Sequence, residues 1–277
     1  MGSREESKSR RRDDIVRAAR SLLRQPGVAA LNMRTLATEA GVSIATPYNL
    51  FGSKQAILVA VLDEDFAEYQ ASLAGLESTG VDALFEAVAL MRRQFDEAPD
   101  FYRNLFSTVR MEVGPELRFV LSGPRYTLWK NLLRTATEQG LLEADVDPDA
   151  FAITLSQLLL SNVQEWAAGY LALDEMDARI RYGVALVLSA VATGQSEAAL
   201  RTRLREAEGD LQTLWRATLK QRLEEGTLNE AARAVLADQL KHIGTPLLEQ
   251  PAGALPEQPA GAQPEQTTDQ IEEETAQ

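Results

Sequence analysis

Apolar residues recur at helical spacing along most of this chain, and no segment alternates apolar and polar residues as a half-buried strand would. Between residues 9 and 24, Ile15, Ala18, Ala19, Leu22 and Leu23 follow the pattern of an amphipathic helix. Glycines or prolines separate such segments from one another. The sequence therefore predicts an all-α protein, with further helices over residues 33–40, 43–50, 54–73, 81–97, 101–111, 116–139, 150–171, 174–192, 196–223 and 228–242.

Composition excludes several classes of functional site and several cellular locations. The chain has no cysteine and one histidine, His242, which excludes disulfides, thiolate metal sites and cysteine nucleophiles. We therefore expect no metal and no cofactor. The polar N-terminus does not resemble a signal peptide, and the longest apolar stretch, residues 183–192, is far too short to span a membrane. We expect a cytoplasmic protein without a membrane partner.

Charge is distributed unevenly along the chain. Residues 1–54 hold ten basic and five acidic side chains, a net charge of +5, although the whole chain carries −13. The remaining residues therefore carry −18. A basic head on an acidic body repels DNA everywhere except at one end, which would orient an encounter with a duplex.

Two short helices are predicted around the segment from Ala37 to Ser43. Asn32 is a plausible N-cap for the first, Gly41 is suited to the left-handed turn that ends it, and Ser43 is a plausible cap for the second. This length and turn chemistry fit a helix-turn-helix, but on spacing alone an ordinary pair of helices fits equally well.

Particular residues distinguish these two alternatives. The run from Gly41 to Leu58, with a Tyr-x-x-Phe-x-x-Lys-x-x-x-Leu core that begins at Tyr48, resembles the recognition region of TetR-family repressors. The resemblance covers roughly residues 10–60. It implies an N-terminal three-helix helix-turn-helix DNA-binding domain followed by a helical-bundle ligand-binding and dimerisation domain. The expected divisions are a disordered basic arm (1–9), the DNA-binding domain (10–55), the sensing and dimerisation domain (56–194), a helical extension (195–245) and a disordered acidic tail (246–277).

The resemblance implies which residues contact DNA. Residues at the start of the third helix would face base edges, where apolar groups suit a thymine methyl. Arg34 would read a guanine, although a solvated surface cation is the alternative, while Tyr48 and Lys54 would contact phosphate. Phe51 is expected to pack in the core. The expected DNA-binding residues are Arg34, Thr35, Ser43, Ile44, Ala45, Thr46, Tyr48, Asn49 and Lys54.

Two positions depart from the family pattern. Leu50 stands where many members carry an aromatic residue or histidine, and Pro47 replaces a helix-compatible apolar residue. Leu50 removes one phosphate donor, so affinity would depend more on the arginines from Arg10 to Arg12, for which simple disorder is the alternative.

The resemblance also implies that the helices over 150–171 and 174–192 pair with their copies in a homodimer as a four-helix bundle. Their apolar stripes are wide enough for this, although a monomeric core could use the same residues. The stripes consist of Phe151, Leu155, Leu158, Leu159, Val163 and Trp166 in the first helix and Ile180, Val184, Leu188 and Val191 in the second.

A small-molecule effector is expected to bind among the aromatic residues of the second domain, with an arginine available to an anionic group. Core packing is the alternative for each aromatic residue. The candidate effector-binding residues are Phe101, Arg103, Phe106, Arg110, Arg125, Tyr126, Trp129 and Trp166.

The extension after residue 195 has a seam of apolar residues at spacings of four and three, from Leu200 to Thr218. It could strengthen the dimer, recruit a partner or pack back on the bundle. The tail repeats a Pro-Ala-Gly-Ala motif and has three consecutive glutamates, Glu272 to Glu274, near its end.

Together these features predict a sequence-specific transcriptional regulator, a repressor that leaves a palindromic operator on double-stranded DNA when a small molecule binds. An enzyme is not expected, because the chain lacks a nucleophile elbow, a phosphate-binding glycine loop and any Cys/His pair. The alternatives are a nucleoid-associated or nonspecific DNA binder without a ligand, and a helical ligand carrier.

Overall fold

The computed structural model describes residues 2–26, 31–112, 115–225 and 228–244, and within these ranges it is built from helices, as the sequence predicts. The tail expected over residues 246–277 lies outside the described residues. The helices are α1 (Gly2–Leu23), α2 (Met33–Glu39), α3 (Ala45–Phe51), α4 (Lys54–Ala74), α5 (Gly80–Glu97), α6 (Pro99–Glu112), α7 (Pro115–Glu138), α8 (Pro148–Ala167), α9 (Leu173–Ser189), α10 (Gly194–Glu224) and α11 (Glu230–His242).

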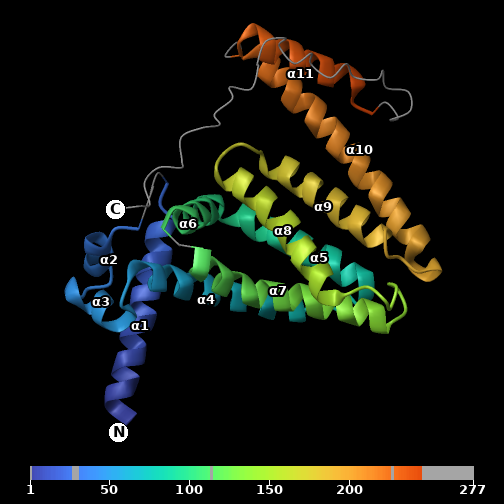
Figure 1. The fold of residues 1–277 in the computed structure, drawn as a ribbon. Coiled ribbons are helices and arrows are strands. Elements are labelled where there is room, and N and C mark those ends of the chain that lie inside the picture. Colours follow the sequence, from blue (N-terminus) through green and yellow to red (C-terminus); the bar gives the residue numbers. More distant parts are fainter. Residues whose placement is uncertain (1, 27–30, 113–114, 226–227, 245–277) are drawn as a thin grey trace, which may run out of the picture.

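Helices α1 to α3 form a three-helix unit at one end of the molecule (Figure 1). The side chain of Asn32 caps α2 by accepting hydrogen bonds from the backbone N–H groups of Arg34 at 2.9 Å and Thr35 at 3.3 Å. Gly41 follows α2 with a φ of 66°, the left-handed conformation that favours glycine. Local capping therefore places the turn between α2 and α3 where the sequence predicts it.

Two expectations about this unit need correction. Helix α1 begins at Gly2, where the sequence predicts a disordered arm over residues 1–9. Ser43 does not cap α3, because Ile44 is the N-cap residue and the Ser43 hydroxyl lies 2.9 Å from that of Thr46 instead. A hydroxyl at Ser43 stands one residue too early to reach the first free N–H groups of this helix.

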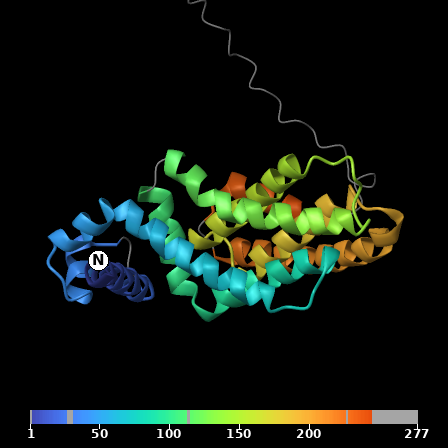
Figure 2. The same ribbon diagram turned by 90° about the horizontal axis from the view of Figure 1, so that it is seen from below.

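Helices α4 to α9 build an elongated body beside the three-helix unit, and α4 joins the two (Figure 2). The helices of the body pack around a hydrophobic core that includes large buried side chains such as Trp166, Leu84 and Leu155. Asp147 caps α8, and Pro148 is its first residue, which is an ordinary helix start.

Polar contacts fix the three-helix unit on the body. The Asn104 side chain of α6 donates to the carbonyl oxygens of Leu23, at 2.9 Å, and Gln25, at 3.0 Å, at the end of α1. Arg20 of α1 reaches Glu68 of α4 at 2.7 Å. These contacts attach the end of α1 to α6 and the middle of α1 to α4.

The apolar stripes of α8 and α9 lie mostly inside the chain's own core. Leu155, Leu159 and Trp166 of α8 and Val184 and Leu188 of α9 are buried. The exposed large apolar side chains on these helices are different ones, namely Ile153, Leu160 and Leu186. Most of these stripe residues are thus used by the chain's own core, and pairing of the two helices with their copies stays a prediction, because helical periodicity shows that a face is buried without showing against what.

Helix α10 packs back along α9. Leu200 and Ala207 are buried, Arg181 of α9 pairs with Asp210 at 3.0 Å, and Thr218 donates to Glu175 at 3.1 Å. Helix α11 then turns back against α10 (Figure 1). Of the three roles left open for the extension, packing on the bundle is the one that the structure favours. No helix within the described ranges is long and apolar enough to cross a membrane.

Candidate nucleic-acid interface

Helix α3 lies on the surface with most of its side chains in solvent. Ala45, Tyr48 and Asn49 are exposed, as is the N-cap residue Ile44, whereas Pro47 is buried. Proline lies near the start of the helix, where its missing N–H breaks no hydrogen bond of the helix. A short helix presented in this way can enter a major groove about 12 Å wide.

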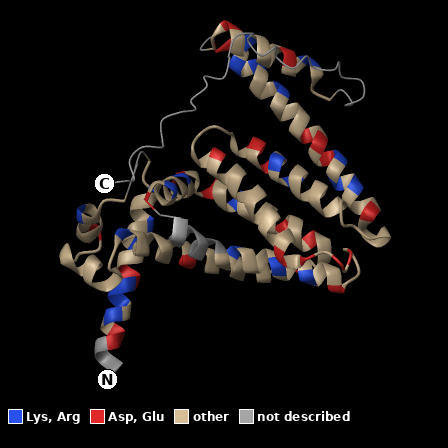
Figure 3. Cartoon of the chain, in the orientation of Figure 1, with Lys and Arg blue, Asp and Glu red and all other residues tan. Residues whose placement is uncertain are grey.

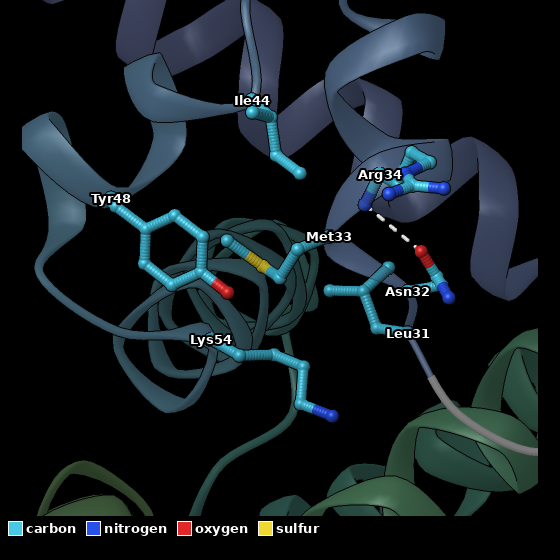
Figure 4. Close-up of a pocket in the computed structure, with 7 residues that line it drawn as sticks. All are labelled: Leu31, Asn32, Met33, Arg34, Ile44, Tyr48 and Lys54. Carbon is cyan, nitrogen blue, oxygen red and sulfur yellow. Dashed lines mark hydrogen bonds between the residues drawn. The ribbon is translucent and has the colours of Figure 1, made fainter.

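Several of the expected DNA-binding residues surround one open hollow of about 470 Å³ between α2, α3 and the start of α4 (Figure 4). Arg34 comes from α2, Tyr48 from α3 and Lys54 from α4, so three elements contribute side chains of complementary chemistry to one place. The residues that line the hollow are Leu31, Asn32, Met33, Arg34, Ile44, Tyr48 and Lys54.

The remaining expected DNA-binding residues lie close to this hollow in the sequence but do not line it. Thr35 and Ser43 are exposed, and Thr46 is half-buried, with its hydroxyl 2.9 Å from that of Ser43. They stand on the same two helices and the turn between them. The structure thus groups the expected residues on the helix-turn-helix without bringing all of them into one pocket.

Lys54 has a partner from the body of the protein. Its ammonium nitrogen lies 2.6 Å from the Glu112 carboxylate at the end of α6, and both side chains are about three-quarters buried. The neighbouring Gln55 side chain donates to the Glu112 carbonyl oxygen at 3.3 Å. To contact a DNA phosphate, Lys54 would therefore have to leave Glu112 or bind both anions at once.

Basic residues gather along the N-terminal half of α1, near the helix-turn-helix (Figure 3). Arg10 and Arg11 are exposed and can approach phosphates. Arg12 is half-buried, because its guanidinium donates to the carbonyl oxygen of Leu50 and lies over the ring of Phe51. Phe51 is itself partly buried against the core.

Some of the candidate effector-binding residues meet in an aromatic cluster between α5, α6 and α8. The ring of Phe95 stacks on Trp166 with centroids 4.9 Å apart, and it lies 5.8 Å from the ring of Phe106. The Arg103 guanidinium lies 5.2 Å from the centroid of Trp166. The indole N–H of Trp166 is buried and makes no hydrogen bond within the described part of the chain.

Other candidates lie elsewhere. Phe101 lines a second open hollow of about 510 Å³ beside Arg20 and Asp65. Tyr126 donates to Asp149 near the start of α8, and Trp129 is buried in α7.

Arg125 lies over the ring of Phe66 at 5.1 Å, and burial lowers the pKa of its guanidinium. Arg110 is exposed on α6.

Several residues that contact the candidate residues were not among those predicted from the sequence. Phe95 and Tyr102 belong to the aromatic cluster, with centroids 4.4 Å apart, and Tyr102 could have been noticed as the neighbour of Phe101. Arg12 could have been separated from Arg11 because the residues three and four positions after it, Ile15 and Val16, are both apolar, whereas Arg11 has Asp14 and Ile15 there. Glu112 carries no such signal.

A buried carboxylate connects the body to α1. The Asp65 side chain accepts a hydrogen bond from the Tyr102 hydroxyl at 3.1 Å and lies 3.5 Å from Arg20. Burial raises the pKa of Asp65 despite these two contacts, and burial with the nearby carboxylate raises that of Tyr102. Across the described residues, no cluster of His, Asp and Glu side chains could hold a metal ion.

Comparison with known proteins agrees with this geometry. Residues 15–61 match the sequence model of the bacterial regulatory proteins, tetR family. The HTH-type transcriptional repressor KstR2 of Rhodococcus jostii (strain RHA1) is 28% identical over 157 residues, which cover 50% of this chain and 72% of that repressor.

Solved structures share the fold at low sequence identity. The TetR-family repressor FadR of Thermus thermophilus, solved in complex with lauroyl-CoA, has a TM-score of 0.55 at 21% identity and matches 66% of this chain and 95% of its own. RolR in complex with resorcinol has a TM-score of 0.56 at 19% identity, over 72% of this chain and 95% of its own. At these identities the likeness concerns the fold.

Proposed function

Because residues 15–61 match the bacterial regulatory proteins of the tetR family, we propose that this chain is a member of that family and a repressor that binds a near-palindromic operator as a homodimer and leaves it when a small molecule binds. A two-fold dimer presents two recognition helices to successive major-groove faces about 34–36 Å apart. Each α3 would then read one half-site, and the operator would repeat the dimer's symmetry.

The observation that carries this proposal is the hollow shared by Arg34, Ile44, Tyr48 and Lys54. It combines a guanidinium suited to a guanine edge, an apolar group suited to a thymine methyl, and hydroxyl and ammonium groups suited to phosphate. A nonspecific DNA binder would need only the cations. A ligand carrier would need none of these groups.

The effector is proposed to bind at the aromatic cluster of α5, α6 and α8. Phe106 is half-buried beside this cluster, the buried indole N–H of Trp166 makes no hydrogen bond within the described residues and is suited to an acceptor, and the exposed Arg103 is suited to an anionic group. The lauroyl-CoA and resorcinol of the two structural relatives likewise combine apolar and polar parts. A ligand can shift the protein away from DNA only by its differential affinity for the two conformations.

The same proposal places the protein in the cytoplasm, with its target DNA, and assigns it no catalytic step. KstR2 is likewise a transcriptional repressor. The candidate residues fit this reading, because Arg34, Tyr48 and Lys54 are suited to binding bases and phosphates rather than to transferring protons or groups.

Selection of bound sequences from a random duplex pool, at near-physiological salt and without ligand, tests the proposal. We expect enrichment of one motif with two-fold symmetry. Enrichment of no motif by the folded protein would favour a nonspecific binder or a ligand carrier. An asymmetric motif would contradict the dimeric arrangement.

A further inference from the structure

We propose that Arg12 is a positioning residue for the recognition helix, because its guanidinium holds the C-terminal end of α3 in the orientation that reading DNA requires. The proposal rests on the function proposed above and assigns a role to a residue that the resemblance grouped with phosphate contacts. It follows from how α3 is attached to the rest of the protein.

Few contacts attach α3 to the protein. The helix has seven residues, and within it only Pro47 is fully buried, while Leu50 and Phe51 are half-buried. Its N-cap residue Ile44 makes no side-chain capping hydrogen bond. Its orientation therefore depends on a small number of contacts, and the contacts at its C-terminal end matter most.

Arg12 makes two different contacts at that end. It donates a hydrogen bond to the carbonyl oxygen of Leu50, and its guanidinium carbon lies 4.1 Å from the centroid of the Phe51 ring. The last carbonyl groups of a helix lack partners within the helix and carry partial negative charge, which attracts a cation. A planar guanidinium can meet this carbonyl and the face of the ring together.

Helix α1 holds Arg12 firmly in place. Ile15 and Val16, three and four residues further along α1, are buried in the core, so Arg12 extends the buried face of the helix. Arg10 and Arg11 point elsewhere and are exposed. Arg12 therefore acts on DNA through α3, whereas its two neighbours are placed to meet phosphates directly.

Three substitutions separate these roles. Arg12→Gln removes the charge and the ring contact, Arg12→Lys keeps the charge but loses the planar group, and Arg11→Gln is the matched control on the exposed face. The first readout is backbone amide hydrogen exchange of the free protein, which requires no DNA. We expect both Arg12 variants to speed exchange in residues 45–52, with α1, α2 and α4 unchanged, and Arg11→Gln to leave α3 unchanged.

The second readout is the affinity for a selected duplex and for a shuffled duplex. We expect Arg12→Lys to lower affinity for the selected duplex by roughly tenfold, because an ammonium cannot meet the carbonyl oxygen and the face of the ring together as the planar guanidinium does, and to leave affinity for the shuffled duplex nearly unchanged. Arg11→Gln should weaken both alike and flatten the salt dependence.

Other outcomes would overturn the positioning role. If Arg12→Lys binds like the parent and Arg12→Gln weakens both duplexes alike, Arg12 is a phosphate contact. If exchange speeds up throughout α1 and α2, Arg12 stabilises the whole unit instead. Failure to select any motif would contradict the proposed function, and the exchange experiment would still decide whether Arg12 holds α3.

Discussion

Arg34 and Lys54 line the same hollow but offer different chemistry to a duplex. Arg34→Ala should relax base preference at one position of each half-site, where a bidentate arginine–guanine contact discriminates by about 1–3 kcal/mol. Lys54→Ala should weaken binding to all sequences alike and lower the salt slope by about 1. Titrations of the selected duplex and its single-base variants at several salt concentrations measure both effects, and identical effects would contradict this division.

Asp65 gives the protein a pH dependence of stability with a definite sign. Its pKa is raised by burial, so the folded state binds a proton more tightly than the unfolded state does. Ionised Asp65 therefore destabilises the fold at neutral pH, and this penalty is relieved as the pH falls through the raised pKa toward the ordinary carboxyl range.

Asp65→Asn should remove this dependence, because its amide oxygen can still accept from Tyr102 and carries no charge. Relative to the parent, the variant should be most stable at neutral pH and should lose that advantage in mild acid. Urea unfolding at both pH values measures it, with Asp63→Asn as an exposed control. A difference that does not vary with pH, or varies in the opposite sense, would refute the assignment.

At the scale of helices, the contact between α6 and the start of α4 is the most direct connection from the body to a phosphate-binding side chain. Glu112→Gln removes the carboxylate that pairs with Lys54, so DNA affinity in the absence of ligand should rise by about two- to fivefold, the range for a modest ion pair. Fluorescence anisotropy with the selected duplex measures this change.

Asp100→Asn is the matched control for this prediction, since it removes the same charge from the other, exposed end of α6. An equal rise in both variants would mean that overall charge is responsible. A fall in affinity for Glu112→Gln would show that Glu112 holds Lys54 in place for DNA.

The helices themselves could be predicted closely, because their signals are local. Asn32, Gly41 and Asp147 act where the sequence places them, as caps and turns that depend on a few neighbouring residues. The cap predicted at Ser43 is wrong, because the start of α3 depends on one residue of register. The disordered arm predicted over residues 1–9 is helical from Gly2, and the charged composition of this segment contains no apolar face that would have indicated a helix.

The contacts that complete the site could not be predicted, because they join residues far apart in the sequence. Arg12 and Leu50 are 38 residues apart, and Lys54 and Glu112 are 58 apart. Periodicity also failed to assign the faces of α8 and α9, since a residue buried in its own chain and one buried against a second copy produce the same pattern.

At the scale of the whole molecule, the exposed apolar side chains of α8 and α9 are the proposed dimer contacts. Ile153 and Leu160, seven residues apart, share a face of α8. Leu186 is exposed on α9, while α10 packs along another face of α9.

Leu160→Arg should therefore give a folded monomer with a large loss of operator affinity. Sedimentation would show the monomer and circular dichroism would show that it is folded. Val235→Arg on exposed α11 should remain dimeric, and a dimeric Leu160→Arg variant would exclude this face.

The central claim is that this molecule reads a DNA sequence through the face formed by α2, α3 and the start of α4. The ratio of its affinities for the selected duplex and a shuffled duplex of equal length, at near-physiological salt, tests that claim most directly. The account predicts a ratio of about a thousand or more, as for other specific DNA readers. A ratio near one would contradict it, because binding would then rest on phosphate contacts alone.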